Sequence, residues 1–239
     1  MQLQKFSMRD KLRRSLLFFF SHRFLALARW EFHFLGLRLW SLVTAQRSRI
    51  HHDVAGRGRP LFLNLGCGPR GRDDPHWVNV DGFRDKSVRY LVDFTRPLPF
   101  DVDSFEGVFC EHVLEHFSFG EGVALAADVY RILRPGGCFR VIVPDAELIM
   151  RRYFDAPSEL IARRGTSGET AMEVVNTYFR QRYEHQFLYD CGTMQKMLLR
   201  AGFDQVTRAS FGRGIFCEPL VLDDQKYEWE SLYVEARRC

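Results

Sequence analysis

Three acidic residues, Asp81, Asp93 and Glu111, each follow a short apolar run that is typical of a buried strand. In an open sheet of parallel strands, ligands bind beyond the carboxyl ends of the strands. A carboxylate there can accept hydrogen bonds from both hydroxyls of a ribose, as we expect for Asp81, or from an adenine amino group, as we expect for Asp93. One such acid alone is typical of a cap or a solvated turn. Three in succession favour a nucleoside-binding edge, with Glu111 facing the same cleft.

Two glycines precede these acids. Gly66 and Gly68 directly follow the apolar run 61–65, and Gly66 stands fifteen residues before Asp81. Glycine lets the backbone approach a ligand closely, and free N–H groups in such a turn can meet a carboxylate or a phosphate. Turns of this kind are common, so the glycines indicate a ligand site mainly because the acids follow them.

The elements that must position these residues alternate between strands and helices. Strands are expected at 61–65, 77–80, 90–92, 107–110, 138–143, 206–211 and 231–236, and helices from about 111, at 122–133 and at 190–201. This alternation predicts a parallel, doubly wound α/β sheet. Asp190 suits the N-cap of the last helix, and Gly202 suits its left-handed end. Residues 146–189 interrupt the rhythm and are expected to form a helical lid.

The composition fits one domain with extensions. The chain has 239 residues, of which 46% are hydrophobic and 27% charged, which excludes disordered and collagen-like classes. Six cysteines occur without a C-x-x-C pair, which argues against a disulfide framework or a zinc ribbon. Reduced thiols in a cytoplasmic protein are the interpretation that follows.

The first 59 residues form a basic arm that is expected to be separate from the domain at 60–239. The arm holds twelve Lys and Arg against three Asp and Glu, a net charge of +9, whereas the rest of the chain has a net charge of −5. A helix over 9–43 would be apolar over most of its circumference, so it must be covered by its own domain, a second subunit or a membrane surface. It contains no charge-free stretch of membrane-spanning length. We expect a cytoplasmic protein, peripheral to the inner face of a membrane if the arm binds lipid, and no nucleic-acid partner.

Several short motifs, in this order, resemble those of class I S-adenosylmethionine-dependent methyltransferases, and more narrowly of small methyltransferases with a type 11-like domain. They are LNLGCG at 63–68, VNVD at 78–81, LPF at 98–100 with SF at 104–105, VLEH at 113–116, RILRPGG at 131–137, HQFLYD at 185–190 and AGF at 201–203. The resemblance covers about residues 60–239. It implies a seven-stranded Rossmann-like sheet whose last strand is antiparallel, and S-adenosylmethionine as cofactor.

The resemblance also implies a set of cofactor-binding residues. The glycine turn would pass under the methionine end, Asp81 would hold the ribose, and Asp93 with Phe94 would flank the adenine. The full expected set is Asn64, Leu65, Gly66, Cys67, Gly68, Asp81, Gly82, Asp93, Phe94 and Glu111. The chain departs from the pattern at Asn64, where the superfamily often has an acid, at Arg70, where a third glycine is expected, and at Glu106, where an Asp is often found.

Methyl transfer requires mainly that donor and acceptor be aligned and water be excluded, because the cofactor brings the activated group. A general base is needed only for a hydroxyl or a protonated amine. The candidate catalytic residues are Glu111, His112, His116 and His185. His112 and His116 fit a structural role equally well. The acceptor is expected to be a small molecule, a sugar or another glycosylated compound, or lipid-linked, as the resemblance suggests.

Three other interpretations compete with an active methyltransferase. The fold could serve as a non-catalytic, cofactor-binding scaffold. The motif H-x-x-E-H formed by His112, Glu115 and His116 could bind zinc in a metal hydrolase if the two histidines share a helix face. No strong third ligand is evident, so we assign no metal from the sequence and expect a fold that does not need zinc. A nicotinamide-binding domain would be expected to have its acid nearer 20 residues beyond the glycine turn, whereas Asp81 stands fifteen residues beyond Gly66.

Overall fold

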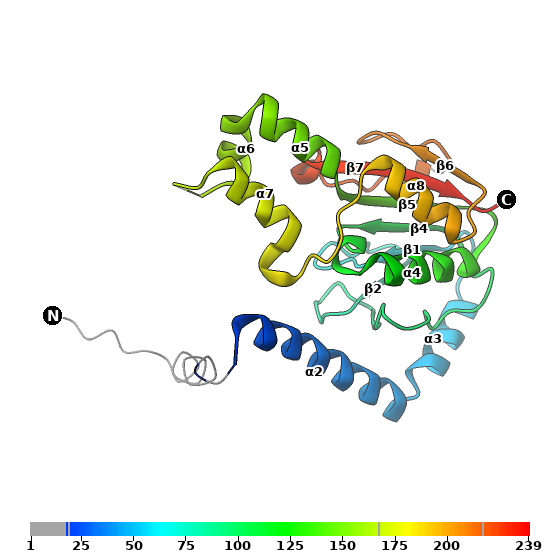
Figure 1. Cartoon of the computed structure of the whole chain (residues 1–239). Helices are drawn as coiled ribbons and strands as arrows, with labels where there is room; N and C mark the ends of the chain where they lie inside the picture. The colour runs from blue at the N-terminus through cyan, green and yellow to red at the C-terminus, as the bar shows by residue number, and fades with distance from the viewer. Residues whose placement is uncertain (1–17, 19, 167, 217) are drawn as a thin grey trace.

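A seven-stranded sheet forms the centre of the molecule (Figure 1). The computed structural model describes residues 18, 20–166, 168–216 and 218–239. The strand order is β3-β2-β1-β4-β5-β7-β6. The strands are β1 (Phe62–Leu65), β2 (Trp77–Asp81), β3 (Tyr90–Leu91), β4 (Phe105–Glu111), β5 (Leu133–Pro144), β6 (Gln205–Arg208) and β7 (Ser231–Arg237). Strands β1 to β5 are parallel, and β7 is antiparallel to both of its neighbours, β5 and β6. The predicted Rossmann-like sheet with an antiparallel last strand is therefore confirmed.

Three helices cover one face of the sheet. They are α3 (Gln46–Ala55), α4 (Phe119–Ile132) and α8 (Cys191–Arg200). Each contributes buried apolar side chains to the main core, and the spacing of Leu125, Val129 and Ile132 places them on one side of α4. Ser118 and Glu121 form a capping box at the start of α4, and Asp190 caps α8 as the sequence predicts. Gly202 follows α8 with a φ of +108°, again as predicted.

The opposite face is covered by the long segment between β6 and β7. This segment includes two 3₁₀ turns, η3 (Glu218–Leu220) and η4 (Gln225–Tyr227), and Leu220 packs with Phe109 and Tyr233 of the sheet. Arg140 of β5 anchors this segment to the sheet. Its side chain is fully buried and donates to Asp223 of the segment, with an Nε–Oδ1 distance of 2.7 Å. A buried arginine requires such partners, because an unpaired charge in the interior is costly.

Residues 146–189 are helical, as the sequence predicts. They form α5 (Ala146–Asp155), α6 (Pro157–Arg164), α7 (Ala171–Arg180) and the 3₁₀ turn η2 (Gln181–Tyr183). These helices share a separate small core that includes Ile149, Leu160 and Val174. The hydroxyl of Tyr178 donates to Glu230 at 2.6 Å and ties this unit to the start of β7. The unit lies on the side toward which the parallel strands point (Figure 1).

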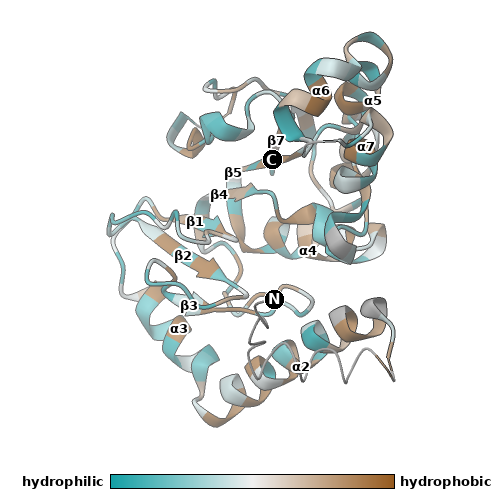
Figure 2. Ribbon diagram, turned by 90° about the vertical axis from the view of Figure 1, so that its left-hand side faces the viewer, coloured by the Kyte–Doolittle hydropathy of each residue, from teal (hydrophilic) through white to brown (hydrophobic). Residues whose placement is uncertain are grey.

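The amino-terminal arm contains α2 (His22–Val43) and α3, whereas residues 9–17 of the expected helix lie outside the described part of the chain. The two helices differ in their packing. Ile50 and Val54 of α3 belong to the main core, although they precede the domain boundary expected at residue 60. Helix α2 lies along the edge of the domain (Figures 1 and 2) and keeps many apolar side chains exposed. Among the described helices, none has the length and apolar character needed to cross a membrane.

The expected helix beginning near Glu111 is wrong. Strand β4 continues through Glu111, His112 takes a φ of +54°, and only a 3₁₀ turn, η1 (Leu114–His116), follows before α4. The pairing of β4 with β1 ends at Cys110, but Glu111 still pairs with Ile142 of β5 and stays extended, so tertiary contacts override the local helical pattern. The last two strand boundaries also shift, and β6 ends at Arg208 rather than at 211.

Candidate active site

The glycine turn after β1 is held by the carboxylate of Asp81. Gly66 and Gly68 have φ values of +76° and +49°, which glycine adopts at little cost. The N–H of Gly68 donates to Asp81 Oδ2 at 2.8 Å, and the N–H of Phe83 donates to Asp81 Oδ1 at 2.8 Å. A carboxylate has about four acceptor positions, so about two remain on Asp81. The expected neighbours Leu65 and Cys67 are buried beside this turn.

The expected adenine-side residues are contacted by the arm. His33 of α2 approaches the carbonyl oxygen of Gly82 with its Nε2 atom at 2.7 Å. Arg38 of α2 donates to Asp93 Oδ2 at 2.6 Å, and Thr95 donates twice to Asp93 Oδ1. Three of about four acceptor positions on Asp93 are therefore used, and one remains. The side chain of Phe94 is buried in the main core.

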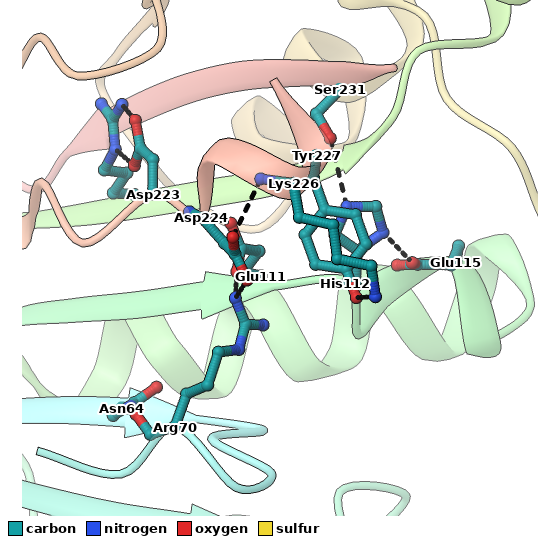
Figure 3. Close-up of polar contacts among 11 residues, drawn as sticks. Asn64, Arg70, Glu111, His112, Glu115, Asp223, Asp224, Lys226, Tyr227 and Ser231 are labelled. Atoms are coloured by element: carbon teal, nitrogen blue, oxygen red, sulfur yellow. Dashed lines mark hydrogen bonds and ion pairs between the residues drawn. The ribbon is translucent and has the colours of Figure 1, made fainter. Parts of the chain in front are cut away.

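Glu111 lies in a polar cluster at the methionine side of the expected site (Figure 3). It is buried, one carboxylate oxygen accepts from Arg70, and the other accepts from the N–H of Asp224 at 3.1 Å. Arg70 also bonds to Asp224 Oδ2 at 3.0 Å. Residues from the glycine turn, with Arg70 and Glu111, line a cavity of about 140 Å³ here. Asn64 also lines this cavity, and its amide donates to the carbonyl oxygen of Arg70 at 3.2 Å.

His112 is fixed on all sides (Figure 3). Its Nδ1 atom bonds to Glu115 Oε1 at 3.0 Å, its Nε2 atom bonds to Ser231 at 3.1 Å, and its ring lies 4.2 Å from the ring of Tyr227. A φ of +54° is strained for a residue with a side chain, and such strain is found at sites where the surrounding structure fixes it. With both nitrogens engaged, His112 has no free atom with which to accept a proton from an acceptor.

His116 and His185 lie side by side, with ring centroids 5.0 Å apart. His116 follows Glu115 on η1, and His185 comes from the segment after η2, which crosses to η1 through backbone bonds from Gln186 and Phe187 to Glu115. The histidines of H-x-x-E-H do not share a helix face, so the hydrolase geometry is not formed. Four predicted catalytic residues nevertheless lie close to the carboxyl end of β4.

Burial and neighbouring charges both shift the pKa values of this cluster, and for Glu115 they act in opposite directions. Burial raises the pKa of Glu115, but the hydrogen bond from His112 and the nearby His116 and His185 outweigh it and hold that pKa below its ordinary value. Burial lowers the pKa of His185, which favours its neutral form near pH 7.

Four residues of this site are not among the candidates from the sequence: Arg70, His33, Arg38 and Tyr227. Arg70 appears there only as a position where a glycine is expected. Arg70 carried a signal, because an arginine inside a glycine turn next to acidic residues is expected to form an ion pair. The other three come from segments with no recognisable motif, and their contacts follow only from the fold.

Cys67 is expected to resist alkylation although it lies in the glycine turn. Burial, with Asp81 nearby, raises the pKa of its thiol to about 12, and the side chain is 3% exposed. Only about one thiol in 10⁴ would then be ionised at pH 8, and the thiolate is the reactive form. Mass spectrometry after iodoacetamide treatment at pH 8 should find Cys239, which is exposed, modified far faster than Cys67. Equal rates would contradict the burial of this turn.

A family model matches part of the chain. Residues 75–141 match the family model of a methyltransferase domain. The matched segment runs from just before β2 into β5 and contains Asp81, Asp93 and Glu111. The search among curated proteins found no match.

Solved structures with similar folds are more distant. An S-adenosylmethionine-dependent methyltransferase from Archaeoglobus fulgidus is 15% identical, with 82% of this chain and 93% of that chain covered and a TM-score of 0.47. One from Thermotoga maritima is 15% identical, with 91% and 97% covered and a TM-score of 0.47. A complex of the Haloferax volcanii Trm112 methyltransferase activator with a methyltransferase gives 14% identity, 78% and 87% coverage and a TM-score of 0.48. Similarity at this level does not bear on the methyl acceptor.

A methyltransferase-domain model thus matches the segment from β2 into β5, and the sheet order with its antiparallel β7 is the Rossmann-like fold that the resemblance predicts.

Proposed function

We propose that the chain binds S-adenosylmethionine along the carboxyl ends of β1, β2 and β4 and transfers its methyl group to a small-molecule, sugar or lipid-linked acceptor. The observation that carries this proposal is the hydrogen bonding of the Asp81 carboxylate. Its carboxylate is fixed by Gly68 and Phe83 and retains about two acceptor positions, which is the number that two ribose hydroxyls require.

The neighbouring residues fit the remaining parts of the cofactor. A side chain built on Gly68 would meet nothing within 4 Å, so the space above the turn is open to a ligand. Asp93 retains one acceptor position, enough for one bond from an adenine amino group, and Arg38 of α2 would then lie beside the adenine. Arg70 is placed to attract the methionine carboxylate, in exchange for one of its present acidic partners.

When bound, S-adenosylmethionine supplies a methyl group activated by a sulfonium. The chain has to align an acceptor with that group and keep water away. Helices α5 to α7 lie at the same end of the sheet and are suited to cover an acceptor (Figure 1). Among the four catalytic candidates, Glu111 and His112 have their polar atoms engaged. His116 and His185 each bond through Nδ1 alone among the described contacts, so either could accept a proton at Nε2.

A screen with a labelled methyl donor tests the proposal. The full chain is incubated with methyl-labelled S-adenosylmethionine and sets of hydroxylated small molecules, sugars and lipid-linked sugars, and labelled products are identified by mass. We expect label in one acceptor class. Cofactor binding without transfer to any class would instead support the non-catalytic scaffold.

We also propose that the exposed side of α2 contacts an anionic membrane surface or a second copy of the chain. Large apolar side chains of α2 remain exposed in the structure: Phe24, Leu27, Phe32, Leu35, Leu39, Trp40, Leu42 and Val43. The first 59 residues have a net charge of +9, which would attract anionic lipid. A cytoplasmic location stays a prediction.

Vesicle sedimentation is expected to separate these two partners. At low salt the full chain should sediment with anionic vesicles, and a variant with Phe32, Leu35 and Leu42 changed to serine should do so several-fold less. The matched control changes Val102, Phe154 and Ile215, which are equally exposed elsewhere, to serine. Point variants are preferable to truncation because α3 contributes to the core. In the alternative outcome, the full chain does not sediment with vesicles, and sedimentation velocity shows a dimer that does not form in the α2 variant. That result would show that the surface binds a second copy.

A further inference from the structure

Three side chains with metal-binding atoms meet beside the carboxyl end of β4. Glu115 and His116 lie on η1, and His185 arrives from the segment after η2. One potential ligand atom from each residue lies within 4.8 Å of the others. Glu115 and His185 are buried, and His116 is partly exposed, so the cluster lies between the interior and the surface.

Both histidine rings are oriented by the backbone. The Nδ1 of His185 lies 2.6 Å from the carbonyl oxygen of Tyr178, and the Nδ1 of His116 lies 3.1 Å from that of Glu184. A carbonyl oxygen can only accept, so each Nδ1 carries the proton and each Nε2 presents a lone pair. Histidines that bind metals almost always donate their second ring N–H in this way, because the bond fixes the tautomer and the ring direction.

The carboxylate of Glu115 is buried with one oxygen unused. Its Oε1 atom accepts from His112 at 3.0 Å, whereas its Oε2 atom has no hydrogen-bond partner among the described residues. The residue is 0% exposed. An unsatisfied buried carboxylate oxygen is costly, and a bound ion is one of the few explanations for it.

We propose that Glu115, His116 and His185 bind a divalent transition metal, with zinc as the preferred ion. Two histidines and one glutamate are a ligand set of catalytic zinc sites. Bonds of about 2.0–2.1 Å would bring the ligand atoms to roughly 3.4 Å apart, so the side chains would have to move closer together on binding. The set differs from the H-x-x-E-H reading of the sequence, because His185 replaces His112, and His112 instead supports Glu115.

Three protein ligands leave a coordination position open. An acceptor oxygen could occupy that position, and His116 and His185 would then serve as ligands rather than as bases. This role rests on the proposed function, whereas the metal site itself does not.

Cobalt titration tests the site. The full chain, without an affinity tag and after removal of metals with a chelator, is titrated with Co²⁺ while visible absorption is followed, and Zn²⁺ is then added in competition. We expect one equivalent to bind with the spectrum of a low-coordinate nitrogen and oxygen site and to be displaced by Zn²⁺. His185→Ala and Glu115→Gln should each weaken binding by more than the roughly 10- to 100-fold that loss of a ligand's hydrogen-bond partner costs. His52→Ala removes an exposed histidine outside the cluster and should change nothing.

Absence of saturable binding, or equal affinity of His185→Ala and the unchanged chain, would overturn the proposal. Circular dichroism of each variant shows whether it is folded, and Glu115→Gln keeps the size of the side chain if His185→Ala does not fold. Binding of S-adenosylmethionine is measured separately on the metal-free chain, so a failure of the proposed function and a failure of the metal site give different results.

Discussion

Asp81→Ala is expected to weaken the binding of S-adenosylmethionine by about 30- to 150-fold. The change removes the acceptor of two ribose hydroxyls, and hydrogen bonds to a charged group contribute about 2–3 kcal/mol. It also releases the N–H groups of Gly68 and Phe83, so the glycine turn loses its support. Both consequences lower the affinity for S-adenosylmethionine.

Isothermal titration calorimetry with S-adenosylhomocysteine measures this effect. Asp81→Asn keeps the size of the side chain and one acceptor oxygen, so its loss should be smaller. Asp73→Ala removes an exposed carboxylate from a nearby loop and should leave the affinity unchanged. An Asp81→Ala variant that binds as tightly as the unchanged chain would show that the ribose is held elsewhere.

Gly66→Ala is expected to lower the free energy of unfolding by about 2–4 kcal/mol. A Cβ atom at this position would lie 2.2 Å from Cγ2 of Val113, and the φ of +76° is unfavourable for alanine. For a chain of this size the melting temperature should fall by roughly 5–15 °C. Cofactor affinity should fall as well, because the turn has to move to relieve the contact.

Two comparisons separate the clash from the backbone strain. Gly68→Ala has a φ of +49° but meets nothing within 4 Å, so it should cost only about 1–2 kcal/mol. Val113→Ala removes the methyl group that the new Cβ atom would clash with. The double variant should therefore lose less free energy of unfolding than the sum of the losses of the two single variants. Strict additivity would show that Gly66 and Val113 are not in contact.

The parts of the site that the sequence could predict depend on short stretches of chain. Gly66 and Asp81 directly follow strands whose apolar runs are visible, and parallel pairing of β1 with β2 brings their ends together. The same reasoning predicts that Asp93 reaches this edge. Local pattern fails at Glu111, where pairing with β5 keeps the chain extended.

Other parts depend on contacts between distant segments. Arg70 meets Asp224 across 154 positions of sequence, and Arg38 meets Asp93 across 55. Nothing in the arm's composition indicates that α2 crosses the expected adenine side, because the arm's charge and apolar character also fit a free helix. His185 is a candidate from its position before the last helix, but its approach to Glu115 follows only from the path of the segment after η2.

Calorimetric titration of the full chain with S-adenosylmethionine tests the central claim most directly. We predict saturable binding of one cofactor per chain, with S-adenosylhomocysteine competing for the same site. Absence of binding of either compound to the folded chain would contradict the assignment of this sheet edge as a cofactor site, and with it the proposed methyl transfer.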